Sequence, residues 1–125
     1  MRFRYSILYV DDVPATLAFY EKAFGFETGF LHEGKDYGEL VTGDTKLAFS
    51  AKSLMREIGK TPSDANPKAP SFELAFETET VAEDFARAVA AGAAPIQEPA
   101  EMPWGQVISY VSDPNGFLIE ICAPN

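Results

Sequence analysis

The sequence predicts an α+β protein built from two β-α-β-β-β modules in tandem. Two observations indicate this fold. A strand followed by a helix occurs twice in 125 residues, first over residues 4–24 and again over residues 71–91, and a glycine follows each helix. A proline-rich stretch separates the two occurrences. A single helix covers only one face of each module's sheet, so we expect the two sheets to face each other and form a trough.

The first module opens with "RYSILYV", whose alternation is typical of a strand. Leu8 and Val10 share one face, and Tyr5 shares the other face with the remaining odd-numbered residues. Asp12 is placed to cap the helix "PATLAFYEKAF", and Gly25 is placed to end it. The stretch "DYGELVTGDTKLAFSA" then predicts a hairpin.

We expect one domain over residues 1–125. The first module takes about residues 1–52, a linker takes about residues 53–69, and the second module takes about residues 70–125. A short helix is expected over residues 53–58, before the prolines of the linker.

The second module repeats the pattern with different residues. In "PSFELAFET", Leu74 and Phe76 share one face, and Glu73 lies on the other. Thr80 and Glu83 have the spacing of a capping box, which predicts a helix start. The hairpin "SDPNGFLIEIC" closes the module.

Composition excludes several partners. The net charge is -9 and the pI is about 4.5, which disfavours nucleic acid and anionic membranes. The apolar run of four residues near the N-terminus is too short for a signal peptide or a membrane span. Cys122 is the single cysteine, so no intrachain disulfide can form, and a cytoplasmic protein is expected.

Two stretches carry a resemblance to a known family. "TLAFYEKAFGFE" and "PWGQVISYVSDPNGFLIEI" resemble the opening and closing modules of the vicinal oxygen chelate superfamily, which includes glyoxalase I, bleomycin resistance proteins and extradiol dioxygenases. The resemblance covers essentially the whole chain. It implies the glyoxalase-like fold, a ligand trough between the modules, and a homodimer.

The resemblance also implies where a metal would bind. Metal-dependent members hold one divalent ion with four side chains, usually two His and two Glu, and these positions fall on Tyr5, Phe49, Ser71 and Glu120. Only Glu120 is of a residue type that the metal-dependent members use as a ligand, and Phe49 has no atom that could bind a metal. We therefore expect no metal and no cofactor. The alternative is a hard cation held loosely by Glu120 and the nearby Glu73, although sites made of oxygen ligands usually need more of them.

A carboxylate within the apolar strand "FLIEIC" needs an explanation, since burying an unpaired charge is costly. Glu120 is either a remnant held by water or by a hydroxyl such as that of Tyr5, or an anchor for a cationic ligand. Trp104 either packs at the corner between strands or forms an aromatic wall of the trough. His32 is the only histidine and lies away from the matched positions, so no His-based catalytic set is predicted.

Three functional hypotheses follow, in order of preference. The first is a bleomycin-resistance-like protein that binds a small molecule, such as a cationic aromatic one, in the trough without a metal. The expected binding residues are Tyr5, Phe49, Ser71, Glu73, Trp104 and Glu120. The second is a lyase or dioxygenase of the lactoylglutathione lyase kind with an unusual metal site. The third is a protein-interaction module. Ordinary metal-dependent glyoxalase I chemistry is not expected, because it needs a metal and a base.

Overall fold

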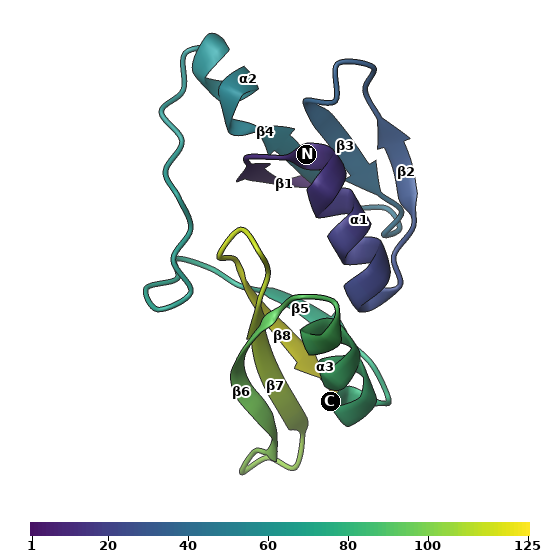
Figure 1. The fold of residues 1–125 in the computed structure, drawn as a ribbon. Helices are drawn as coiled ribbons and strands as arrows, with labels where there is room; N and C mark the ends of the chain where they lie inside the picture. Colours follow the sequence, from purple (N-terminus) through teal and green to yellow (C-terminus); the bar gives the residue numbers. More distant parts are fainter. The chain divides into compact units, whose positions relative to one another are not determined.

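The computed structural model describes all residues 1–125 and divides into two compact units, Met1–Ser63 and Asp64–Asn125. Each unit carries one four-stranded mixed sheet with a helix lying along one face (Figure 1). The predicted α+β fold of two βαβββ modules is therefore confirmed. None of the helices is long and apolar enough to cross a bilayer.

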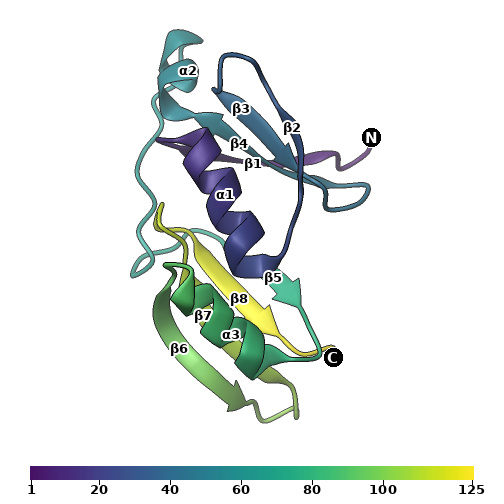
Figure 2. The same cartoon turned by 45° about the vertical axis from the view of Figure 1, so that its right-hand side comes forward.

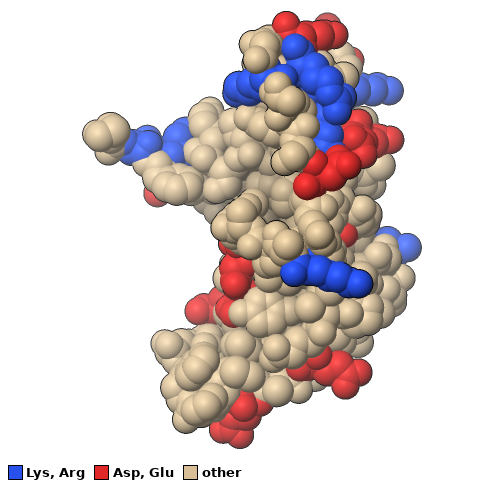
Figure 3. Space-filling model, turned by 90° about the vertical axis from the view of Figure 1, so that its left-hand side faces the viewer, with Lys and Arg blue, Asp and Glu red and all other residues tan.

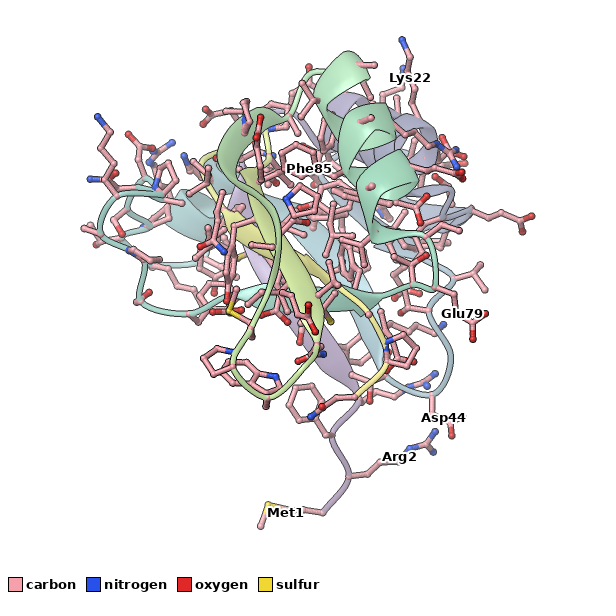
Figure 4. The ribbon with its side chains drawn as sticks, turned by 90° about the horizontal axis from the view of Figure 1, so that it is seen from below. Met1, Arg2, Lys22, Asp44, Glu79 and Phe85 are labelled. Atoms are coloured by element: carbon pink, nitrogen blue, oxygen red, sulfur yellow. The ribbon has the colours of Figure 1, made fainter.

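The first unit contains the elements β1 (Tyr5–Val10), α1 (Val13–Phe24), β2 (Thr28–Leu31), β3 (Tyr37–Leu40), β4 (Lys46–Ala51) and α2 (Lys52–Glu57). Its strand order is β1-β4-β3-β2, with β1 parallel to β4 and the other neighbours antiparallel. Before β1, Met1 and Arg2 project away from the sheet (Figure 4).

Helix α1 begins and ends as the sequence predicts. The carboxylate of Asp12 accepts a hydrogen bond of 3.0 Å from the backbone N–H of Ala15. Gly25 follows the helix at φ 76°, a left-handed conformation that glycine adopts without steric cost, and its N–H donates to the carbonyl of Glu21.

The core of the first unit lies between α1 and the sheet. Tyr20 and Phe49 are fully buried, and their ring centroids lie 4.9 Å apart. Gly38 of β3 passes directly beneath the helix, where an added Cβ would come within 2.7 Å of Leu17 Cδ1. This close approach lets α1 rest on the sheet.

The second unit contains β5 (Leu74–Glu77), α3 (Val81–Ala90), β6 (Ala94–Glu101), β7 (Val107–Ser112) and β8 (Leu118–Cys122). Its order, β5-β8-β7-β6, repeats that of the first sheet, with β5 parallel to β8 (Figure 2). The two units thus share one topology, as the internal repeat predicts.

The predicted capping box at the start of α3 is wrong. Thr80 occupies the N-cap position, but its side chain makes no cap hydrogen bond. Its hydroxyl donates instead to the carboxylate of Asp84 at 2.9 Å, and the hydroxyl of Thr78 donates to the same oxygen. The Thr80 hydroxyl is thus oriented toward the Asp84 carboxylate and not toward a backbone N–H of the first helical turn.

The turn between β7 and β8 is built on a buried aspartate. Asp113 is 3% exposed, and its Oδ1 accepts hydrogen bonds of 2.9 Å from the backbone N–H groups of Asn115 and Phe117. Gly116 completes the turn at φ 91°. The Asp-Pro-x-Gly hairpin predicted from the sequence is confirmed.

The segment before β5 packs on the second unit. A Cβ on Gly116 would lie 2.6 Å from the carbonyl oxygen of Ala65, so the segment approaches the turn as closely as glycine allows. The side chain of Asn66 accepts from the N–H of Lys68 at 3.0 Å. The rings of Phe72 and Phe117 lie 6.1 Å apart. Part of the expected linker is thus a structured edge of this unit.

Candidate functional site on the helix-free sheet faces

We call the side of each sheet opposite its helix the helix-free face. In the first sheet, Ile7 pairs with Ala48 and Leu8 pairs with Phe49 across the parallel strands β1 and β4. Leu8 and Phe49 are buried on the side of α1, so Tyr5 and Ile7, which are 44% and 45% exposed, lie on the helix-free face.

The expected placement of Phe49 on the ligand face is therefore wrong. Phe49 is fully buried and packs on Tyr20 of α1. Because side chains alternate along a strand, its neighbours Ala48 and Ser50 take the helix-free side. The motif match was one residue out of register.

The same register argument changes the partner of Tyr5 in the repeat. Tyr5 precedes the first residue of α1 by eight positions, and Glu73 precedes the first residue of α3 by the same eight positions. Glu73, rather than Ser71, is thus the counterpart of Tyr5. Ser71 is exposed and precedes β5, outside the sheet. In the second sheet, Glu120 of β8 pairs with Ala75 of β5, and in the first sheet Ala48 of β4 pairs with Ile7 of β1. Ala48 is therefore the counterpart of Glu120.

Glu120 has a partner that sequence reasoning missed. Tyr110 of β7 lies directly opposite Glu120, and its hydroxyl donates a hydrogen bond of 2.8 Å to Glu120 Oε2. Burial, then the hydrogen bond and charge of Glu120, and then Glu73 raise the pKa of Tyr110. The structure therefore brings Tyr110, Glu120 and Glu73 together on the helix-free face of the second sheet.

The first sheet carries a similar pair that has its own cation. The hydroxyl of Tyr37 donates to Glu39 Oε2 at 2.8 Å, and Lys46 Nζ lies 3.1 Å from Glu39 Oε1. Burial alone would raise the pKa of Glu39, but hydrogen bonds from Tyr37 and Lys46 and the charges of Lys46 and Arg4 lower it. This carboxylate is neutralised locally.

Glu120 has no such cation. The salt bridges of the structure join His32 to Asp36, Lys46 to Glu39 and Lys52 to Asp11, all within the first unit. The second unit carries ten Asp and Glu against two Lys and Arg, whereas the first carries nine against eight. Figure 3 shows basic side chains gathered around α2 and mainly acidic ones over the second unit. A cation from outside would meet a favourable field at Glu120.

The thiol of Cys122 lies near this carboxylate. Burial and then Glu120 raise the pKa of Cys122 to about 11, so the thiol stays protonated at neutral pH. Its Sγ lies 3.7 Å from the carbonyl of Phe76. Cys122 behaves as a small buried side chain, not as a nucleophile.

Trp104 lies in the turn between β6 and β7 and is 61% exposed. Its indole N–H donates to Gln106 Oε1 at 2.9 Å, and Gln106 Nε2 donates to the carbonyl of Ala123 at 2.7 Å. This chain fixes the ring near the end of β8. Ala123 follows Glu120 by three residues, about 10 Å along the strand.

The matched positions do not fit the metal site of the metal-dependent members. Nowhere in the structure do three or more His, Cys, Asp or Glu side chains group as they would to hold a metal ion. The corrected set is Tyr5, Ala48, Glu73 and Glu120, which supplies two carboxylates and no imidazole. His32 donates or accepts only within its own loop, 3.1 Å from Asp36.

Comparison with known proteins identifies the family. The glyoxalase/bleomycin resistance protein/dioxygenase superfamily matches residues 2–121. The chain belongs to this superfamily. It is 29% identical to virulence protein STM3117 of Salmonella typhimurium over 124 residues, which cover 96% of this chain and 82% of that protein. The crystal structure of STM3117 matches with a TM-score of 0.71, covering 100% of this chain and 98% of that one, at 26% identity.

Two further structures of superfamily proteins share the fold. A glyoxalase-related enzyme from Fulvimarina pelagi matches with a TM-score of 0.86 and 24% identity, covering 99% of this chain and 88% of that one. A glyoxalase/bleomycin resistance protein/dioxygenase family enzyme from Burkholderia phytofirmans matches with a TM-score of 0.79 and 24% identity, covering 98% of each chain. At this identity the likeness shows the fold alone.

Proposed function

We propose that this superfamily member binds a small molecule on a helix-free sheet face, where Glu120 receives a cationic group of an aromatic ligand. The observation that supports this most directly is the difference between the two Tyr–Glu pairs. Glu39 binds Lys46 through the oxygen that Tyr37 leaves free. Glu120 has the same hydrogen bond from a tyrosine and no cation.

A ligand cation would take at Glu120 the place that an ammonium group takes at Glu39. Glu73 and the acidic surroundings of the second unit would add attraction, which speeds association more than it strengthens binding. Trp104, in the same unit as Glu120, offers an exposed ring for stacking or cation–π contact, worth roughly 0.5–2 kcal/mol. Phe49 does not line a helix-free face, because it is buried against Tyr20 of α1.

The test compares two probes of nearly equal shape. We expect the cationic 2-naphthylmethylammonium to change Trp104 fluorescence saturably and more strongly at low salt than the neutral 2-naphthylmethanol. Glu120→Gln should weaken binding of the cation and spare the alcohol. Glu79→Gln is the matched control, because Glu79 lies beyond the end of β5 (Figure 4). The proposal would be contradicted if each probe bound Glu120→Gln as tightly as it binds the unchanged chain.

A metal-dependent lyase or dioxygenase is the alternative, because enzymes share this superfamily. The two functions differ in metal content and in turnover. Under the binding proposal, chain purified without chelators should contain well under one transition metal per molecule, and isomerisation of the methylglyoxal–glutathione adduct should stay at background. Equimolar metal with metal-stimulated turnover would favour the enzyme.

We further propose that the chain acts as a homodimer in the cytoplasm. Each sheet has one face that its own helix leaves uncovered, and the single thiol of Cys122 suits a reducing compartment. Light scattering should give about twice the chain mass of 13.7 kDa. A monomer at micromolar concentration would contradict the dimer.

A further inference from the structure

Three tyrosine hydroxyls on the helix-free faces have defined partners, and one differs from the others. Tyr37 and Tyr110 each donate to a glutamate. Tyr9 of β1 instead accepts a hydrogen bond of 3.2 Å from Lys60 Nζ. A hydroxyl that accepts from an ammonium group keeps its own hydrogen for donation.

After this hydrogen bond, the Tyr9 hydroxyl and the Lys60 ammonium group each still have hydrogens to donate. Lys60 makes no salt bridge, and its ammonium group lies 5.6 Å from the centroid of the Tyr9 ring. Backbone bonds hold the base of Lys60, whose N–H donates to the carbonyl of Met55 at 2.9 Å. Two donors 3.2 Å apart match the two oxygens of a carboxylate, as charge-assisted pairs in proteins do.

The surface beside this pair is apolar and carries a second cation. Ile7 and Tyr5 continue along β1 on the same face, half exposed. The guanidinium of Arg4 lies 5.5 Å from the centroid of the Tyr5 ring and donates to the backbone carbonyl of Asp44 at 2.8 Å. Tyr5 lies about 13 Å from Tyr9 along the strand, which leaves room for a two-ring system over Ile7.

We propose that the helix-free face of the first sheet binds an aromatic carboxylate, whose acid group accepts from Tyr9 and Lys60 and whose ring lies against Ile7 and Tyr5. Tyr37 donates to the carboxylate of Glu39, and Tyr110 donates to that of Glu120. At Tyr9, the carboxylate of the ligand takes the corresponding place. This deepens the proposed small-molecule binding by adding a site for an anionic aromatic ligand that the first unit forms by itself.

The test uses 2-naphthoate, with 2-naphthylmethanol as the neutral control, titrated into the full-length chain and followed by calorimetry and by amide NMR shifts. We expect naphthoate to shift amides of β1 and the region of residue 60. Tyr9→Phe and Lys60→Met should each weaken naphthoate binding about two- to tenfold and leave the alcohol unchanged. Lys68→Met, an exposed lysine of the second unit, should bind naphthoate as the unchanged chain does.

The outcomes separate this inference from the function proposed above. Naphthoate that binds Tyr9→Phe and Lys60→Met with unchanged affinity, or that shifts only amides of the second unit, overturns the inference even if Glu120→Gln weakens the cationic probe. Loss of naphthoate affinity in both variants supports it even if the cationic probe never binds.

Discussion

Replacing Phe49 with alanine tests the register of β4, on which the description of both helix-free faces depends. Phe49 is fully buried, and its ring packs 4.9 Å from that of Tyr20. Truncating a fully buried phenylalanine removes its apolar contacts and leaves a cavity, so we expect the free energy of unfolding of the first unit to fall by about 3–5 kcal/mol. Tyr5→Ala, at a side chain that is 44% exposed, should cost less than about 1 kcal/mol.

The assay must follow the first unit. Trp104 is the only tryptophan and lies in the second unit, so its fluorescence reports the unfolding of that unit. Urea titrations followed by far-UV circular dichroism and by amide exchange in β1 and β4 would report the first unit, whether or not the two unfold together. A loss below about 1 kcal/mol for Phe49→Ala, with a larger loss for Tyr5→Ala, would show that Phe49 faces outward after all.

Three further predictions concern the second unit. Burial and Glu120 raise the pKa of the Cys122 thiol from 9.0 to about 11, so the stability that the thiol contributes is complete below pH 9 and is lost as the pH rises to 11. The same causes raise the pKa of the Tyr110 phenol above its ordinary value of 10.0, so its contribution is complete below pH 10 and is lost at higher pH than that of the thiol. Alkaline unfolding should show this loss of stability, and Glu120→Gln should reduce it. Cys122 should resist a disulfide reagent at pH 8 until urea unfolds the chain, and fast labelling of folded protein would refute its burial. Gly116→Ala should lower the free energy of unfolding by about 1–3 kcal/mol more than Gly92→Ala, because both glycines have positive φ but only at Gly116 would an added Cβ lie within 3 Å of backbone atoms. Unfolding measured by tryptophan fluorescence would test this, and equal losses in the two variants would refute the close contact.

Elements with clear alternation or a clear cap were predictable from the sequence. The alternation of Leu8 and Val10 with Tyr5 identifies the two faces of β1, and Asp12 and Gly25 mark the start and the end of α1. These signals are local, so they need no knowledge of what packs against them. The internal repeat then extends the same fold to the second half.

The site was less predictable because it depends on register between strands. The stretch "KLAFSA" of β4 is small or apolar at every position after its lysine, so alternation cannot tell which residues face the helix. A shift of one residue moves a side chain to the opposite face, which is how Phe49 was misplaced. The hydroxyl partner of Glu120 was assigned to Tyr5 and not to Tyr110 for the same reason, because only the pairing of β7 with β8 brings Tyr110 opposite Glu120.

The packing of residues 65–72 against the second unit has a consequence for dividing the chain. A fragment that starts at β5 would lose the Ala65 carbonyl that covers Gly116 and the ring of Phe72 that rests on Phe117. A cut within residues 61–63 would leave these contacts with the C-terminal fragment and the Lys60–Tyr9 contact with the N-terminal one. Split reporters and permuted chains made from this protein should therefore break there, several residues earlier than its strands alone suggest.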